Sequence, residues 1–452
     1  MSFANVGRGD GYDRGKRHFA HMLKRFLIVV VALGVLGILG LGALAWRPAI
    51  APIAPPAPAT FAATLVATGE ALAGGGHCAD CHTVDGGQKF AGGYAMATPF
   101  GVIYSTNITP DPETGIGTWP EAAFTRAMRE GVARDGSLLF PAFPYNHFTR
   151  LSDDDVKALY AFFMTRLPVR AAAQKNGLPF PLNVRYLQAG WRLLFFRPGR
   201  FETESRKSAE WNRGAYLAEA LSDCGGCHTP RNLLGAEKSG DAYAGAVIDN
   251  WIAPPLTAAN PAPVPWTQEE LLAYLRDGVS ILHGSAAGPM APVVRGLAAL
   301  PEQDVRALAT YFADLDHADD RLASVGPAVA RAMSHASPGV GEDDVDARLT
   351  TAACQSCHYN SGKAPLAVRP DLALNSALHL PEPDNFIQVV LHGIDAKDGI
   401  PGVVMPSFGP ALDDADIARI AAYLRRTRTN LPPWPNLQSK IAAARRSTSA
   451  LP

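Results

Sequence analysis

The sequence predicts a mainly α-helical protein made of three similar units that follow an apolar N-terminal helix. Two observations carry this prediction. Three stretches each contain a helix-like run, a Cys-x-x-Cys-His motif, a long Gly/Pro-rich segment and a closing amphipathic helix. Ahead of them, residues 26–46 contain no charged side chain. The 452 residues are enough for about three small domains.

The N-terminal apolar stretch, Phe26 to Trp46, is long enough to cross a membrane. Its 21 residues rise about 1.5 Å each as a helix and so cover a hydrocarbon core of about 30 Å. Basic side chains dominate residues 1–25, so we expect the N-terminus to stay in the cytoplasm and the rest of the chain to lie in the periplasm. A cleaved signal peptide is the alternative, with Ala43-Leu44-Ala45 as its cleavage box. We favour a retained anchor, because signal h-regions span only about 7–15 residues.

Every cysteine belongs to a Cys-x-x-Cys-His motif. This spacing lets two thiols attach to the vinyl groups of one haem while the adjoining imidazole reaches the iron. A zinc knuckle, a thioredoxin-like redox pair and a disulfide framework also use paired cysteines. Three copies with no cysteine left over favour three covalently bound haem c groups. The attachment cysteines and proximal ligands are Cys78, Cys81 and His82; Cys224, Cys227 and His228; and Cys354, Cys357 and His358.

The units repeat in register. Each unit has a glycine step before its closing helix, at Gly131, Gly278 and Gly393. The closing helices are expected at 152–163, 301–312 and 413–424, with acidic first turns and apolar residues at i, i+3, i+4 and i+7.

The repeat and the composition divide the chain into segments. The predicted segments are a cytoplasmic basic segment 1–25, a transmembrane anchor 26–46, a Pro-rich linker 47–62, haem domains 63–172, 208–318 and 346–430, an aromatic linker 173–207, a second linker 319–345 and a C-terminal tail 431–452. We expect residues 47–58 to be extended and to hold the first domain off the membrane, and Ser324 to Val345 to be flexible.

The repeat also locates candidates for the sixth iron ligand. An electron-transfer haem needs a second axial group, usually a methionine sulfur. Twelve residues after two of the glycine steps stand Met290 and Met405, each in a Pro-bearing loop, and we predict that both ligate iron.

In the first unit the same position is Phe143, which cannot bind iron. The nearest competent side chain is His147, which we predict as the sixth ligand; Met96, Met128 and Met164 are less well placed. The alternative is that His147 lies on the surface or on a propionate and that this iron is five-coordinate. Bis-histidine ligation would lower the potential of this haem, whereas an open position would bind small ligands.

Two further features bear on partners. Residues 178–201 are dense in Trp, Phe and Arg, which predicts interdomain packing or, alternatively, contact with a bilayer interface or a partner. Beyond the basic N-terminus the chain is slightly acidic, which argues against nucleic acid as a partner. No Ser/His/Asp constellation, P-loop or dinucleotide fingerprint occurs, so no catalytic residue is predicted.

Over nearly its whole length the chain resembles the tri-haem cytochrome c subunits of bacterial membrane-bound periplasmic dehydrogenases. The resemblance implies three tandem class I cytochrome c domains that pass electrons from a catalytic subunit to ubiquinone in the cytoplasmic membrane, without substrate chemistry of their own. The matching stretches are Ser105–Asp111 with Thr114–Trp119, Cys227–Asn232 and Trp251–Leu256.

The type of catalytic partner is less closely defined. The Pro-Ala-Phe-Pro-Tyr-x-His-Phe stretch from Pro141, where many members have methionine, is similar to the branch that accompanies molybdenum hydroxylases, as is Phe180–Asn183. This implies a molybdopterin aldehyde dehydrogenase, with a possible iron-sulfur subunit. Quinoprotein alcohol and flavin gluconate-type dehydrogenases are the alternatives. From other classes, we keep a haem enzyme or ligand-binding protein with an open first haem, and a plain carrier to a terminal oxidase.

Overall fold

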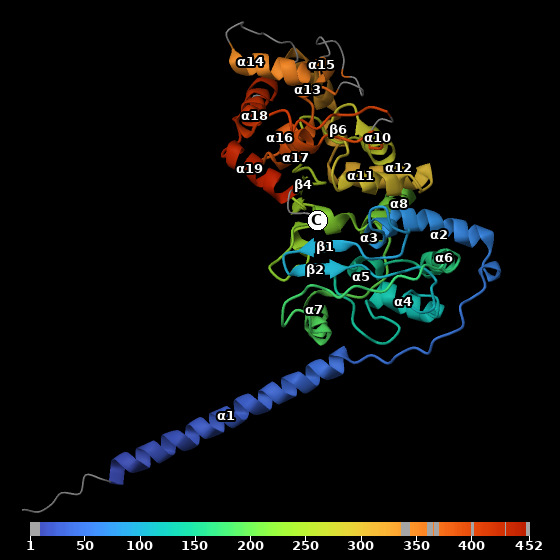
Figure 1. The fold of residues 1–452 in the computed structure, drawn as a ribbon, viewed down its shortest axis with the longest axis vertical. Coiled ribbons are helices and arrows are strands. Elements are labelled where there is room, and N and C mark those ends of the chain that lie inside the picture. The colour runs from blue at the N-terminus through green and yellow to red at the C-terminus, as the bar shows by residue number, and fades with distance from the viewer. Residues whose placement is uncertain are drawn as a thin grey trace, which may run out of the picture.

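The computed structural model describes residues 10–335, 344–358, 365, 370–398, 402–429 and 431–448. Over these residues the architecture is mainly helical, as predicted, with three short antiparallel hairpins. An N-terminal helix, α1 (Asp10–Ala45), projects obliquely from a body that holds the other elements (Figure 1). One stretch of it, His21–Ala45, is long and apolar enough to cross a membrane, and its described side chains are exposed except for Leu41 and Ala45 near its end.

One helix pairing occurs three times in the body. In each case a helix that leads into a Cys-x-x-Cys-His motif packs against a later closing helix, and a middle helix packs on that closing helix. The pairs are α2 (Ala63–Gly75) with α6 (Asp153–Met164), α8 (Ala209–Tyr216) with α12 (Glu302–Leu315), and α14 (Val345–Thr350) with α18 (Asp414–Arg428). The middle helices are α4 (Glu121–Glu130), α10 (Gln268–Asp277) and α17 (Asp384–His392).

Local sequence explains where these helices begin and end. The Ser152 hydroxyl and the Asp413 carboxylate accept hydrogen bonds from the backbone N–H of Asp155 (3.1 Å) and Asp416 (2.8 Å), which caps α6 and α18. Acidic residues in their first turns add favourable interactions with the helix dipole. Gly131 and Gly278 end α4 and α10 with φ of 60° and 77°, a left-handed conformation that glycine adopts without strain.

Two glycines allow the paired helices to cross closely. A Cβ at Gly69 on α2 would overlap the Ala158 carbonyl oxygen on α6, and a Cβ at Gly214 on α8 would overlap the Ala307 carbonyl oxygen on α12. The first two units therefore share one crossing geometry, and any larger residue at these glycines would force the helices apart.

The hairpins and the remaining helices fill the space between these pairs. The hairpins are β1 (Ala95–Thr98) with β2 (Gly101–Tyr104), β3 (Ala246–Ile248) with β4 (Trp251–Ala253), and β5 (Val279–Ser280) with β6 (Gly284–Ser285). The further α-helices are α3 (Cys78–His82), α5 (Tyr145–Phe148), α7 (Gln188–Phe195), α9 (Cys224–His228), α11 (Met290–Leu297), α13 (Leu322–His335), α15 (Ser356–His358), α16 (Ser376–His379) and α19 (Leu437–Thr448). Short 3₁₀ or π turns are η1 (Pro58–Thr60), η2 (Arg185–Leu187), η3 (Leu217–Leu221), η4 (Ser239–Asp241), η5 (Asp319–Arg321) and η6 (Thr351–Gln355).

The first and second units share a single apolar core, whereas the third has its own. One cluster of buried side chains runs without a break from α2 and α6 to α8 and α12. A separate cluster joins α17, α18 and α19. The third unit meets the second through a small apolar cluster, in which Val264 packs with Leu374, and through polar contacts. The Asn385 amide, for example, bonds both the N–H (2.7 Å) and the carbonyl (2.9 Å) of Ile252.

Three connecting segments differ from what the sequence led us to expect. Residues 47–57 are extended but lie along the first unit, because the Ile50 N–H bonds the Arg134 carbonyl (2.8 Å) and the Arg126 guanidinium bonds the Pro48 carbonyl (2.7 Å). They follow the surface of the first unit instead of standing away from it. Ser324 to His335, expected to be flexible, belongs to α13, and residues 336–343 lie outside the described part. The expected C-terminal tail contains α19, whose Ile441 is fully buried in the third core.

Candidate functional site

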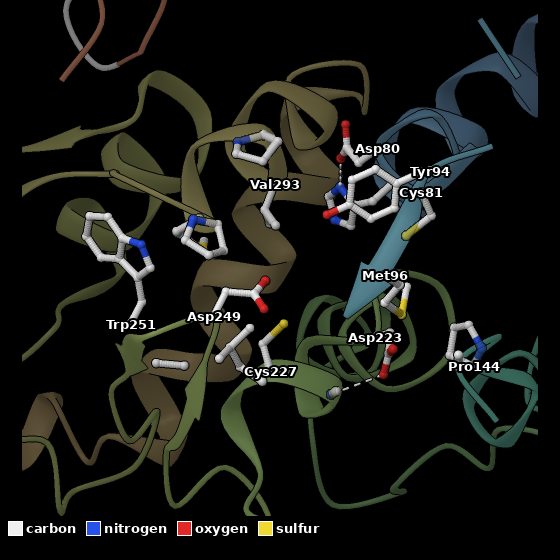
Figure 2. Close-up of a pocket in the computed structure, with 18 of the residues that line it drawn as sticks. Asp80, Cys81, Tyr94, Met96, Pro144, Asp223, Cys227, Asp249, Trp251 and Val293 are labelled. Atoms are coloured by element: carbon white, nitrogen blue, oxygen red, sulfur yellow. Dashed lines mark hydrogen bonds and ion pairs between the residues drawn. The ribbon is translucent and has the colours of Figure 1, made fainter. Parts of the chain in front are cut away.

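All three Cys-x-x-Cys-His motifs line one connected cavity of about 3460 Å³. A drug-sized ligand typically occupies a pocket of about 300–1,000 Å³, so this cavity has room for several large cofactors. Cys81 of the first motif and Cys227 of the second lie on the wall of the same part of the cavity (Figure 2).

Each motif forms about one turn of helix, in α3, in α9, and across η6 and α15. Residues i and i+3 of a helix share one face, so the two cysteines of each motif point to the same side. Before α9 the chain bends sharply at Asp223, whose φ is 48° and whose carboxylate accepts from the Gly226 N–H (3.1 Å). The motif is thus held in shape by its own backbone contacts.

The histidine of each motif is oriented by a backbone carbonyl. The Nδ1–H groups of His82, His228 and His358 donate to the carbonyls of Thr106 (2.6 Å), Pro254 (2.7 Å) and Pro370 (3.1 Å). A carbonyl only accepts, so Nδ1 carries the proton and Nε2 is left with a lone pair. Burial lowers the pKa of all three imidazoles, which keeps them neutral. A neutral, oriented imidazole is the form that ligates iron.

The cysteine environment fits thioether attachment better than redox chemistry or zinc. Burial raises the pKa of Cys78 to about 12 and that of Cys81 and Cys354 to about 11. A reactive dithiol needs a lowered thiol pKa. Among the residues that the structure describes, no motif brings three potential metal-ligand atoms together, as a zinc site would require.

Met290 and Met405 both line the cavity, as their repeat positions predict. Met290 begins α11, and Met405 is paired with Ile394 in a two-residue bridge (N–H to carbonyl, 2.9 and 3.1 Å). Phe143 lines the cavity of the first unit and packs on Phe148 with ring centroids 5.3 Å apart. The structure therefore places a hydrocarbon ring at the position where the other two units have sulfur.

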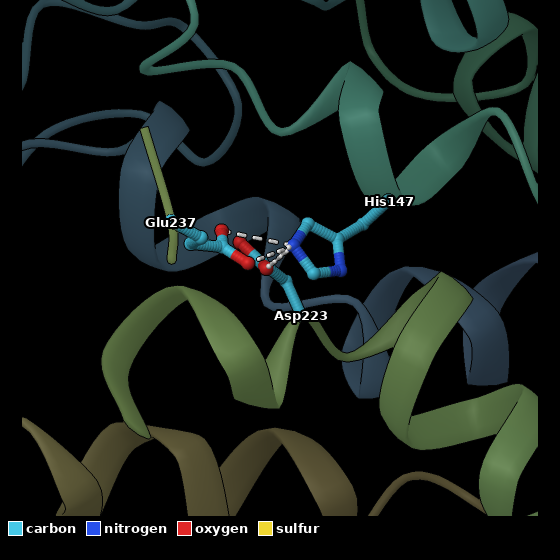
Figure 3. Close-up of side chains that lie close together, drawn as sticks. All are labelled: His147, Asp223 and Glu237. Atoms are coloured by element: carbon cyan, nitrogen blue, oxygen red, sulfur yellow. Dashed lines mark hydrogen bonds and ion pairs between the residues drawn. The ribbon is translucent and has the colours of Figure 1, made fainter. Parts of the chain in front are cut away.

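His147 conflicts with its predicted role as the sixth ligand of the first haem. It does not line the cavity, and both of its ring nitrogens have protein partners. Nδ1–H donates to the Glu219 carbonyl (2.9 Å), while Nε2 faces the carboxylates of Asp223 (2.9 Å) and Glu237 (3.0 Å), as Figure 3 shows. Sequence spacing could not reveal this, because every partner comes from the second unit.

The charge of this buried cluster follows from its contacts. Burial alone would lower the pKa of His147, but the carboxylates of Asp223 and Glu237 outweigh it and raise that pKa well above its usual value. The imidazolium in turn lowers the pKa of Glu237 against the opposing effect of burial. We therefore interpret the cluster as an ion pair that joins the first unit to the second.

Some residues that line the cavity were harder to predict from the sequence than the motifs and the repeat methionines. Met96 on β1 and Met128 on α4 line the cavity near the first motif, whereas Met164 is buried away from it. Met128 stands three residues before Gly131, the register position held by Leu275 and Val390 in the other units, and all three line the cavity. The repeat register could have identified these wall positions, although not their distance from iron.

A helical fold with a buried, carbonyl-oriented Cys-x-x-Cys-His turn defines a c-type cytochrome. The "Cytochrome c" family matches residues 66–166, and "Cytochrome C oxidase, cbb3-type, subunit III" matches residues 343–424. Among curated proteins, the chain is 37% identical to the fructose dehydrogenase cytochrome subunit of Gluconobacter japonicus, over 86% of this chain and 83% of that one. It is also 37% identical to the gluconate 2-dehydrogenase cytochrome c subunit of Pantoea cypripedii, over 80% and 85%.

The chain therefore belongs to the family of cytochrome c subunits of dehydrogenase complexes, and its role is electron transfer rather than substrate catalysis. A higher identity, 48% over 89% of this chain, relates it to a nicotinate dehydrogenase subunit of Pseudomonas putida. The chain spans only 34% of the length of that relative.

Proposed function

We propose that this chain is a membrane-anchored, tri-haem cytochrome that passes electrons from a periplasmic dehydrogenase subunit to ubiquinone. The observation that carries the proposal is the threefold recurrence of one site, with a Cys-x-x-Cys turn and an Nδ1-bonded histidine on the wall of one connected cavity. Haem c, when bound, would supply one-electron transfer. The three units would be three tandem cytochrome c domains.

In this proposal the chain holds each haem in place and keeps water away from it. The cysteine pairs would tether the porphyrins. His82, His228 and His358 would each ligate one iron, and Met290 and Met405 would also ligate the second and third irons. The apolar core shared by the first two units would hold their haems in a fixed relation. That arrangement favours rapid transfer along the chain over exchange with solvent.

The membrane part of the proposal rests on α1. The described side chains of its apolar stretch, His21–Ala45, are exposed except for Leu41 and Ala45 near the end, so lipid is the natural solvent for this stretch. Lys24 and Arg25 lie near its N-terminal end, and the preference of basic residues for the cytoplasmic side supports a cytoplasmic N-terminus with the body in the periplasm.

The catalytic partner we favour is a molybdopterin hydroxylase that oxidises an aldehyde or an N-heterocyclic carboxylate, with a possible iron-sulfur subunit between them. Support comes from the higher identity to the nicotinate dehydrogenase subunit than to the fructose and gluconate dehydrogenase cytochromes. A quinoprotein alcohol or flavin gluconate-type dehydrogenase is the alternative partner.

The test is a comparison of membranes with and without this chain. With the chain present, a molybdopterin subunit should co-purify from detergent extracts, and substrate should reduce a short-chain ubiquinone. Without it, the catalytic subunit should still reduce a soluble dye but no quinone. Quinone reduction that persists without the chain would contradict the proposal.

A second candidate function rests on Phe143. Because it replaces the repeat methionine and His147 points elsewhere, the first haem is the one at which a small ligand could bind iron. Carbon monoxide binding to the reduced protein distinguishes such a site from full six-coordination.

A further inference from the structure

We propose that α7 and its flanks lie in the interfacial layer of the periplasmic leaflet, so that the first unit rests on the lipid surface. The inference rests on the proposed membrane anchor and adds a second membrane contact to it. We define the α7 surface by its exposed apolar side chains, which are Phe180 (82% exposed), Tyr186 (67%), Leu193 (62%) and Leu194 (58%).

The depth of α7 follows from its contact with α1. Ala189 of α7 is buried with Ala45 and Leu41 of α1 in one small apolar cluster that also includes Val132 and Leu138. The apolar stretch of α1 ends at Ala45, and Leu41 lies about one helical turn, or 5.4 Å, inside that end. A helix that touches α1 between these two residues must lie within the outer layer of the bilayer, where interfacial helices sit about 5–10 Å deep.

The connection between α1 and the body is too short and too well bonded to let α7 move along the membrane normal relative to α1. Helix α1 ends with the Trp46 N–H bonded to the Gly42 carbonyl (2.9 Å). Two residues later the Pro48 carbonyl accepts from Arg126 (2.7 Å), and a Cβ at Gly136 would overlap the Arg47 carbonyl oxygen. The body is therefore seated directly on the end of the span, and α7 lies beside the point where α1 reaches it (Figure 1).

The chemistry of the α7 surface suits a lipid interface. Leucines and aromatic rings that would be costly in water are combined there with the exposed cations Arg185 and Arg197. Trp46, 69% exposed, adds an interfacial aromatic at the end of α1 itself. Apolar contact and attraction to anionic head groups would act together.

The inner side of α7 has a different role. Gln188, Trp191 and the partly exposed Leu194 line the cavity that the three motifs share, and the Gln188 amide oxygen is buried without a hydrogen-bond partner. One short helix thus separates the first haem site from lipid. The first unit would be the one nearest the membrane, and α14 of the third unit lies at the opposite end of the body (Figure 1).

The test is photolabelling of the full-length holoprotein in nanodiscs that contain a phospholipid with a diazirine on its acyl chain. We expect adducts on the peptides that cover α1 and on those that cover residues 186–200, but none on the peptide that contains Val345, an equally exposed aliphatic side chain on α14 (50%). Replacing Leu193, which is 62% exposed and does not line the cavity, with aspartate should reduce the adducts on residues 186–200 and leave those on α1.

The outcomes separate this inference from the anchor. Adducts on α1 without any on residues 186–200 of the wild-type protein would overturn the inference and leave the anchor intact. Absence of adducts from α1 as well would overturn both. Because the wild-type protein alone decides between these results, the inference does not depend on whether the aspartate variant folds.

Discussion

Replacing His147 with glutamine should destabilise the junction of the first and second units and leave the coordination of every haem unchanged. His147 is the centre of a buried ion pair with Asp223 and Glu237, whose side chains are 11%, 26% and 19% exposed. Glutamine keeps a similar size and one amide donor but removes the positive charge. Asp223 and Glu237 would then lose their closest positive charge, and among the described residues only Arg231, 3.9 Å from Glu237, would still pair with this cluster.

The burial of these three side chains sets the size of the expected loss of stability. Removing one partner of a buried ion pair costs about 3–5 kcal/mol, and the partial exposure of the carboxylates places this pair near about 3 kcal/mol. For a cooperative unit of about 150–250 residues, 1 kcal/mol shifts the melting temperature by about 2–4 °C. We therefore expect a loss of about 6–12 °C in the holoprotein.

The assay combines thermal unfolding, followed by far-ultraviolet circular dichroism, with the absorption spectrum of the oxidised and reduced protein. His317→Gln is the matched control, because His317 is 65% exposed and its pair with Asp320 (3.6 Å) is on the surface. A His147→Gln protein that melts with the wild type, or one that shows a new high-spin haem, would refute the ion-pair interpretation. The second result would restore His147 as an iron ligand.

The same variant has a defined pH dependence. The folded-state pKa of His147 is raised, so its contribution is fully present below the ordinary histidine pKa of about 6.5 and is lost as pH rises through the raised value. The pKa of Glu237 is lowered, so its contribution is present above its ordinary value and is lost in acid. The difference in melting temperature between wild type and variant should thus be largest in mildly acidic buffer and should shrink in alkaline buffer.

Further predictions concern the haem positions and the helix crossing. Carbon monoxide should bind one of the three reduced haems, the one beside Phe143; no binding at all would point to Met96 or Met128 as a ligand. Met290→Leu and Met405→Leu should each abolish one thioether-to-iron absorption and open one further haem to carbon monoxide, and an unchanged spectrum would remove that methionine as a ligand. Gly69→Ala should destabilise the fold by about 1–3 kcal/mol, as measured by denaturant unfolding, because its Cβ would meet the Ala158 carbonyl, whereas Gly199→Ala, with open space around it, should not.

The sequence predicted those parts of the site that depend on local pattern. A Cys-x-x-Cys-His turn is a contiguous unit, and the glycine steps place Met290, Met405 and Phe143 by counting residues. The closing helices could be predicted equally well, because an acidic first turn followed by apolar residues at helical spacing describes α6, α12 and α18 without reference to the rest of the fold.

The sequence could not predict features that depend on contacts between distant segments. Nε2 of His147 is bonded by Glu237, which lies 90 residues away in the second unit. Nothing in the local sequence of residues 47–57 predicts that their carbonyl groups accept hydrogen bonds from Arg126 and Arg134. Likewise, the position of α7 depends on distant contacts: Ala189 packs on the end of α1, and the Trp191 indole N–H donates to the Leu234 carbonyl (3.0 Å).

The central claim is that three haems are covalently attached to this 48.0 kDa chain. The most direct measurement is the mass of the denatured polypeptide after acid-acetone extraction, combined with a thiol count. The account predicts the mass of the chain plus three haems and no cysteine that reacts with a maleimide. A chain that retains fewer than three haems, or that exposes free thiols from any of the three motifs, would contradict it.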